Sequence, residues 1–142
     1  MTILDAYAII AYLRGEPSSA EVAGLLRGPA RLTAVNAAEV CDQMVRVFGS
    51  DPDAVEADLA LLCHAGMRMV PVPAEIAMQA ARIRARRCHR GRAAVSLADC
   101  VAASAALAHR EPLATADPAL ASVLRAEGGD VHPLPDSTGR RP

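Results

Sequence analysis

Four acidic residues in this sequence have the type and spacing that metal-dependent chemistry requires. They are Asp5, Glu39, Asp99 and Asp117. Carboxylates gathered in one place repel one another and raise one another's pKa, and a hard divalent cation relieves that repulsion. Ligation by oxygen atoms alone suits Mg²⁺ or Mn²⁺. The first hypothesis is therefore a divalent-metal site that serves phosphoryl chemistry.

Each of these acids also has a purely structural interpretation. Two pairs have the spacing of a capping box, in which an acid in the first turn bonds the backbone of the cap: Asn36 with Glu39, and Ser96 with Asp99. Asp117 precedes a proline, as N-cap residues often do, and Asp5 fits the N-cap of the first helix. Taken singly, each acid is explained as well by capping as by catalysis.

The segments between the acids indicate how they are positioned. Short apolar segments are predicted to be strands at 2–5, 31–35, 69–72, 112–115 and 131–134. Helices are predicted at 7–14, 18–27, 36–48, 51–65, 74–90, 96–109 and 118–127. This alternation predicts an α/β fold with a short, mainly parallel sheet covered on both faces. Ligands bind beyond the carboxyl ends of such strands, where the four acids are expected to converge.

Length and composition favour one compact domain. The 142 residues suffice for a single core, and 52% hydrophobic residues with a net charge of -1 argue against disorder. We expect a domain over residues 1–135 and a disordered tail over 136–142. No apolar run approaches the roughly 20 residues that span a bilayer, and no signal peptide is evident. The sequence therefore predicts a cytoplasmic protein without a membrane segment.

Several other chemistries are excluded or disfavoured. All 15 basic residues are arginine, which rules out a Walker A lysine or a Schiff-base lysine. The glycine fingerprint of dinucleotide-binding folds is absent. The four cysteines form no Cys-x-x-Cys pair, so buried free thiols are a better interpretation than a zinc site.

Four sequence motifs together resemble a known family. They are Ile-Leu-Asp-Ala-Tyr-Ala-Ile-Ile-Ala at 3–11, Val-Asn-Ala-Ala-Glu-Val at 35–40, Ser-Leu-Ala-Asp-Cys at 96–100, and Leu-Ala-Thr-Ala-Asp at 113–117. Their order and spacing resemble PIN-domain nucleases, in particular the VapC toxins of bacterial toxin–antitoxin pairs. The resemblance implies a three-layer α/β/α fold, often dimeric. It also implies Mg²⁺- or Mn²⁺-dependent cleavage of RNA, inhibited by a cognate VapB-type antitoxin.

The resemblance also assigns roles to individual residues. It implies that Asp5, Glu39, Asp99 and Asp117 bind the metal, and that Thr115 orients Asp117 or the attacking water. The sequence departs from the family's pattern at Ala116, where relatives often have a polar or basic residue, and at Leu120, where they often have Phe. Both departures concern the loop that carries Asp117.

The remaining site residues are supporting ones. Asn36 and Ser96 are predicted to cap their helices and so to position the acids that follow. The best candidates for contact with RNA belong to one arginine run, because arginine binds phosphate through two parallel hydrogen bonds: Arg82, Arg86, Arg87 and Arg90. A solvated helix face explains the same run equally well.

Two other functions stay open at this point. A non-catalytic PIN-like binding or regulatory module would use the acids only as caps, and it predicts no divalent-metal binding. A metal-dependent DNA nuclease or phosphatase would use the same acids on another substrate. A Ser-His-Asp hydrolase is disfavoured because the sequence has no Gly-x-Ser-x-Gly motif.

Overall fold

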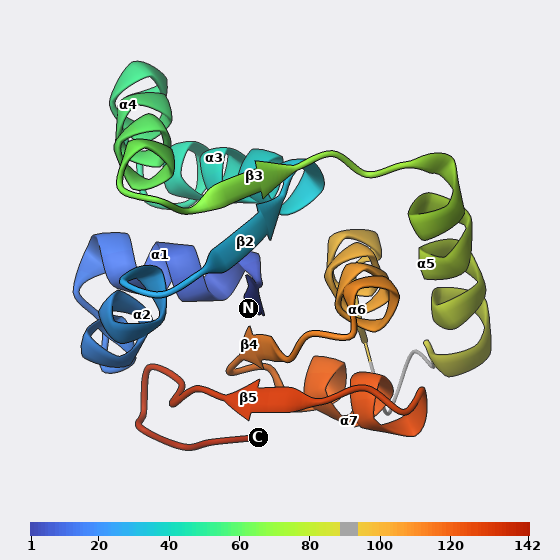
Figure 1. Ribbon diagram of the computed structural model, residues 1–142. Coiled ribbons are helices and arrows are strands. Elements are labelled where there is room, and N and C mark those ends of the chain that lie inside the picture. The colour runs from blue at the N-terminus through green and yellow to red at the C-terminus, as the bar shows by residue number, and fades with distance from the viewer. Residues whose placement is uncertain (89–93) are drawn as a thin grey trace.

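The computed structural model describes residues 1–88 and 94–142, in which strands and helices alternate (Figure 1). The strands are β1 (Thr2–Leu4), β2 (Ala30–Thr33), β3 (Arg68–Val70), β4 (Leu113–Thr115) and β5 (Val131–Pro133). The helices are α1 (Ala6–Arg14), α2 (Ser19–Leu26), α3 (Ala34–Arg46), α4 (Pro52–His64), α5 (Ala74–Arg87), α6 (Leu97–His109) and α7 (Pro118–Ala126). None of these helices is long and apolar enough to cross a membrane.

The five strands form one sheet in the order β3-β2-β1-β4-β5, and every neighbouring pair is parallel. Ile3 of β1 lies between Arg31 of β2 and Leu113 of β4. Since all the strands run in the same direction, their carboxyl ends meet at one edge of the sheet. The predicted parallel sheet is confirmed, and the segments after β1, β2 and β4 come together at that edge.

Successive side chains of β1 show why the sheet needs helices on both faces. Ile3 and Leu4 are both completely buried, and side chains next to each other in a strand point to opposite faces. Leu4 packs in a cluster with residues of α1 to α4, whereas Ile3 packs with residues of α5, α6 and α7. Figure 1 shows α1 and α2 on one side of the sheet and α5 and α6 on the other. The predicted three-layer α/β/α arrangement is confirmed.

The start of α3 differs from the prediction. Asn36 was predicted to be its N-cap, but the helix begins at Ala34 and its cap is Thr33, whose hydroxyl accepts a hydrogen bond from the Asn36 N–H at 3.1 Å. Asn36 is instead a completely buried residue of the first turn. The physical reason is that β2 ends at Thr33, whose extended backbone and hydroxyl suit a cap.

Two further segments concern the bounds that the sequence predicts. Helix α5 ends at Arg87 because Cys88 has an extended backbone, and Arg90 lies outside the described residues. The segment 136–142, which is predicted to be a disordered tail, contacts α2 through one of its residues, and its disorder stays a prediction. Arg141 pairs with Glu21 of that helix at 2.8 Å, and its guanidinium also donates to the carbonyl of Pro133.

Candidate active site

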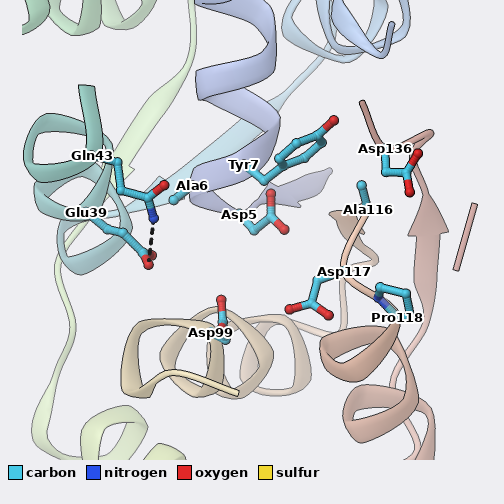
Figure 2. A pocket seen from close by; sticks show the side chains of 10 residues that line it. All are labelled: Asp5, Ala6, Tyr7, Glu39, Gln43, Asp99, Ala116, Asp117, Pro118 and Asp136. Atoms are coloured by element: carbon cyan, nitrogen blue, oxygen red, sulfur yellow. Dashed lines mark hydrogen bonds between the residues drawn. The ribbon is translucent and has the colours of Figure 1, made fainter. Parts of the chain in front are cut away.

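A cavity of about 380 Å³ opens where the carboxyl ends of β1 and β4 meet the starts of α3 and α6. All four acids singled out in the sequence line it, as Figure 2 shows. The complete lining is Asp5, Ala6, Tyr7, Glu39, Gln43, Asp99, Ala116, Asp117, Pro118 and Asp136. The fold therefore brings together four carboxylates that are spread over more than one hundred residues of sequence.

Asp5 joins the central strand to α1 and is only 3% exposed. Its Oδ1 atom caps α1 by accepting a hydrogen bond from the Ala8 N–H at 2.8 Å. The pKa of Asp5 is raised to about 7: burial is the largest cause, the charges of Asp99 and Asp117 also raise it, and hydrogen bonds from Thr115 and Ala8 oppose the shift. Asp5 is thus a buried acid that holds its proton to a much higher pH than an ordinary carboxyl group, and a nearby positive charge would favour its ionised form.

Asp99 is held by a capping box at the start of α6. Its Oδ2 atom accepts from the Ser96 N–H at 2.7 Å, and the Ser96 hydroxyl accepts from the Asp99 N–H at 3.0 Å. Burial raises the pKa of Asp99, the bonds to Ser96 lower it, and the charge of Asp117 raises it. The prediction that Ser96 caps this helix and positions Asp99 is confirmed.

Asp117 follows β4 and caps α7. Its Oδ1 atom accepts from the N–H groups of Ala119 at 2.7 Å and Leu120 at 3.3 Å. The hydroxyl of the buried Thr115 accepts from the Asp117 N–H at 3.0 Å, which fixes the turn between strand and helix. Thr115 thus lies beside Asp117, and the predicted N-cap is confirmed.

Glu39 lies in α3 and caps no helix. Both of its carboxylate oxygens have side-chain donors: Asn36 Nδ2 lies 3.4 Å from Oε2, and Gln43 Nε2 lies 3.3 Å from Oε1. Burial raises the pKa of Glu39, and the charge of Asp99 raises it further, while the two amide donors lower it. The two amides therefore orient Glu39 toward the acids on the other side of the cavity.

Capping and ligand binding do not compete for the same atoms in this cavity. Asp99 uses Oδ2 for its cap and Asp117 uses Oδ1. Within residues 1–88 and 94–142, Asp99 Oδ1 and Asp117 Oδ2 have no hydrogen-bond donor, and both carboxylates face the cavity (Figure 2). A cap that fixes one oxygen presents the other in a defined position. The structural and the chemical interpretation of these acids are therefore compatible.

The family model described as PIN domain matches residues 2–125. The chain belongs to the PIN-domain family. Comparison with curated proteins gives no match.

Solved structures share the fold of this PIN domain. VapBC2 from Rickettsia felis, bound to a promoter DNA fragment, is 14% identical, with a TM-score of 0.69 over 94% of this chain and 98% of that chain. FitAcB from Neisseria gonorrhoeae is 23% identical, with a TM-score of 0.65 over 92% of this chain and 96% of that chain. VapC20 from Mycobacterium tuberculosis is described as a sarcin–ricin loop cleaving toxin. It is 15% identical, with a TM-score of 0.66 over 86% of this chain and 94% of that chain. At these identities the likeness establishes the fold.

The donor set of the PIN-domain cavity suits a hard divalent ion, because every candidate ligand is a carboxylate oxygen. In the described part of the chain, no three His, Cys, Asp or Glu side chains are close enough together to hold one ion among them. Mg²⁺ seldom needs such a cage, since one or two carboxylates usually hold it while waters and substrate phosphate complete the octahedron. The residues therefore fit a largely hydrated ion.

The arginine run lies away from the acids. Arg86 and Arg87 both pair with Glu127 at 2.8 Å. Arg82 and Arg86 line a separate hollow on α5, and Arg90 falls outside the described residues. Contact between this run and RNA stays a prediction, and among the described arginines none lines the acidic cavity.

Three polar residues of the lining were not singled out in the sequence. Gln43 lies one helical turn after Glu39, a spacing that indicates a shared face of a helix. Tyr7 lies two residues after Asp5, where no spacing rule draws attention to it. Asp136 follows β5, and only the order of the strands, with β5 beside β4, brings it near the site.

Proposed function

We propose that this PIN domain is a metal-dependent endoribonuclease that hydrolyses RNA phosphodiester bonds with Mg²⁺ or Mn²⁺. The observation that carries the proposal is the convergence of Asp5, Glu39, Asp99 and Asp117 on one cavity at the carboxyl edge of the sheet. Raised pKa values of three of these acids support it, because a cluster that resists ionisation gains most from a divalent cation.

We further propose that the chain is the toxin of a toxin–antitoxin pair and that it is neutralised by a VapB-type antitoxin. Its structural neighbours include toxin–antitoxin complexes and a toxin described as cleaving the sarcin–ricin loop, which supports RNA as substrate and a protein as partner. A homodimer is part of the same proposal. The four free cysteines agree with action in the reducing cytoplasm, the compartment that we propose.

In the proposed mechanism, Mg²⁺ or Mn²⁺ held by the acids would supply the positive charge that polarises the scissile phosphate and lowers the pKa of the attacking water. Asp5 and Asp99 would be the principal ligands, since each is a buried acid whose orientation is fixed by a helix cap. Glu39 would hold the attacking water and accept its proton, and its raised pKa makes it a stronger base than an ordinary carboxylate. Asp117 would complete the cluster with its Oδ2 atom through a water molecule on the ion. No side-chain nucleophile is needed.

The supporting residues act by holding these carboxylates. Ser96 fixes Asp99 through the capping box, and Thr115 fixes the turn that carries Asp117. Asn36 orients Glu39 through its amide. Removal of any one of them changes the direction of an acid without removing a ligand, so we expect partial losses of activity at these positions and near-complete losses at the acids.

The experiment compares cleavage of a mixed pool of structured RNA in Mn²⁺, Mg²⁺ and EDTA by the wild type and by Asp99→Asn. Asp42→Asn is the matched control, because Asp42 is an exposed acid of α3 that pairs with Arg46 at 2.8 Å outside the cavity. We expect metal-dependent cleavage by the wild type and Asp42→Asn, and none by Asp99→Asn.

Parallel assays with DNA and with a small phosphate ester test the rival substrates. Preferential hydrolysis of either would replace RNA in the proposal. The non-catalytic alternative predicts that Mn²⁺ and Mg²⁺ leave the melting temperature unchanged and that RNA stays intact. A folded Asp99→Asn variant with full activity would refute the assignment of the site.

A further inference from the structure

The charge of the cavity poses a problem for a site that binds RNA. Its lining includes five carboxylates and, among the described residues, no arginine or histidine. The phosphates of RNA therefore meet a surface of their own sign, and a divalent ion neutralises only part of it. Affinity must also come from contacts that carry no charge. The site thus needs an uncharged surface that recognises another part of the nucleotide.

Tyr7 supplies such a surface beside the acids. It is half-buried in the first turn of α1, two residues after Asp5, and its ring lines the cavity. Figure 2 shows the ring between Asp5 and Asp136, above Ala116. The other uncharged groups of the lining apart from Gln43 are small or rigid: Ala6, Ala116 and Pro118. A flat aromatic group with small neighbours provides room for a planar ligand.

The chain contains only three aromatic residues, and their surroundings differ. Phe48 is covered by the guanidinium of Arg14, which lies 3.7 Å from its ring centroid. Tyr12 packs against the core that includes α1 and α2, and it does not line the cavity. Tyr7 also contacts this core. Unlike Tyr12 and Phe48, it lines the cavity beside the acids. Filling the core does not by itself require an aromatic ring at the cavity.

The orientation of the Tyr7 ring is fixed from outside the helix. Its hydroxyl donates to the carbonyl of Pro135 at 3.3 Å, 128 positions away in the sequence. Pro135 is buried and follows Leu134, whose N–H donates to the Thr115 carbonyl at 2.8 Å. The ring is thus tied at one end to α1 and at the other to the segment after β5. An aromatic ring held in place in advance loses little entropy when it binds a ligand.

We propose that Tyr7 stacks on the nucleobase next to the phosphate that the carboxylates bind through the metal. Single-stranded RNA is commonly bound through bases stacked on aromatic side chains, and such stacking needs no positive charge. The proposal rests on the proposed ribonuclease function and adds a residue that selects for an unpaired base at the cleavage point. Tyr7 is a substrate-binding residue in this scheme and takes no part in proton transfer.

Intrinsic fluorescence tests the stacking directly, because the chain has two tyrosines and no tryptophan. In the full-length Tyr12→Phe variant, Tyr7 is the only tyrosine, so the tyrosine emission comes from Tyr7 alone. The probes are adenosine 5′-monophosphate and ribose 5-phosphate in Mg²⁺, neither of which contains a phosphodiester bond to cleave. Free tyrosinamide corrects for absorption by the base. We expect the nucleotide to quench Tyr7 emission and ribose 5-phosphate to leave it unchanged.

The Tyr7→Phe variant is the matched control, since its emission comes from Tyr12 alone and should not respond to either probe. Equal effects of the two probes on Tyr7, or equal quenching of Tyr12, would overturn the proposal. Cleavage kinetics supply a second measurement. We expect Tyr7→Leu to raise KM for RNA by roughly tenfold, the size of one lost base–aromatic stack, with a small change in kcat.

Tyr7→Phe keeps the ring and should keep KM within about threefold of the wild type, whereas Tyr12→Leu, on the same helix but outside the cavity, controls for lost packing. An unchanged KM in folded Tyr7→Leu would overturn the stacking while the nuclease stands. Quenching of Tyr7 by the nucleotide in a protein that cleaves no RNA would reject the nuclease and retain the base-binding residue.

Discussion

Asn36 links Glu39 to the start of the neighbouring helix α6. Its Nδ2 atom donates to Glu39 Oε2 at 3.4 Å and to the carbonyl of Ala98 at 3.3 Å, and Ala98 directly precedes Asp99. Its Oδ1 atom accepts from the Thr33 hydroxyl at 2.6 Å. Because Asn36 is completely buried, water cannot replace these partners. One side-chain amide therefore sets how the helices of two candidate ligands lie against each other.

The first prediction concerns the loss of that amide. Asn36→Ala removes the side-chain donor to the Ala98 carbonyl and leaves the buried Thr33 hydroxyl without an acceptor for its proton, so we expect the free energy of unfolding to fall by about 1–3 kcal/mol. We also expect kcat to fall, because Glu39 loses its orienting donor. Urea unfolding and RNA cleavage measure the two effects. Gln43→Ala is the control, because it removes the other donor to Glu39 from a less buried position. It should lower kcat with little loss of stability. Wild-type stability in Asn36→Ala would contradict this account.

The same residue shows where prediction from sequence succeeds and where it fails. The strands, their parallel direction and the gathering of the acids at one edge follow from apolar segments, glycine and proline positions, and the general rule for such sheets. The predicted cap of α3 is wrong because Thr33 and Asn36 are both residue types that cap helices, and the acid three residues after Asn36 favours the wrong one. Burial of Asn36 against Ala98, 62 residues away, decides between them, and no local pattern contains that information.

The lining of the cavity shows the same division. Sequence spacing draws attention to residues that follow a strand or lie near the start of a helix, and the four acids are predicted to be such residues. Tyr7 and Asp136 reach the cavity through tertiary packing, since Tyr7 bonds Pro135 and Asp136 follows the edge strand β5. Their place depends on how the end of the chain returns to α1, which the sequence does not reveal.

The second prediction separates the two roles of Asp117. Asp117→Asn keeps an oxygen that can accept from Ala119 and Leu120, so the cap and the stability should be retained while metal-dependent cleavage is largely lost. Asp117→Ala loses the cap as well and should lower the free energy of unfolding by about 1 kcal/mol. Thermal unfolding and cleavage of both variants provide the comparison. Full cleavage by Asp117→Asn would leave Asp117 with a structural role only.

The third prediction concerns the arginine run. Arg86 and Arg87 are already paired with Glu127, whereas Arg82 has no salt bridge within the described residues. If the run contacts RNA, Arg82→Ala should weaken RNA binding. The plot of the logarithm of the binding constant against the logarithm of the salt concentration should also become less steep, by about 0.7 in its slope. Arg87→Ala should mainly loosen the contact between α5 and α7. RNA affinity measured at several salt concentrations distinguishes them. A slope unaffected by Arg82→Ala would assign the run to a solvated helix face.

The fourth prediction concerns the segment 136–142. Its contacts are exposed ones: Arg141 with Glu21, and the turn in which Asp136 Oδ1 accepts from the Thr138 and Arg140 N–H groups. Water screens such contacts, so they contribute little to stability. We expect a chain that ends at Pro135 to unfold with an unchanged midpoint in urea. Fast amide hydrogen exchange over 136–142 in the full chain would agree with the predicted disorder, and slow exchange would contradict it.

The fifth prediction follows from the pKa of Asp5, about 7 in the folded protein against 3.8 for the unperturbed group. Between these values the folded state holds a proton that the unfolded chain has released. The free energy of unfolding of the metal-free protein should therefore fall as pH rises from about 4 to 7, by at most about 4 kcal/mol, and then level off. The raised pKa values of Glu39 and Asp99 act in the same direction.

Asp5→Asn tests the origin of this slope, because its side-chain oxygen still accepts from Ala8 while the titrating group is gone. We expect the variant to be more stable than the wild type at pH 8, to differ less at pH 4.5, and to show a shallower slope between them. Mg²⁺ should stabilise the wild type more at pH 8 than at pH 5, since the ion binds the charged acids. Urea unfolding over this pH range in EDTA and in Mg²⁺ gives all three results. The opposite result would be a free energy of unfolding of the metal-free wild type that rises from pH 5 to 7.5. It would mean that Asp5 is ionised without the ion. The electrostatic argument for a metal at this cavity would then lose its basis.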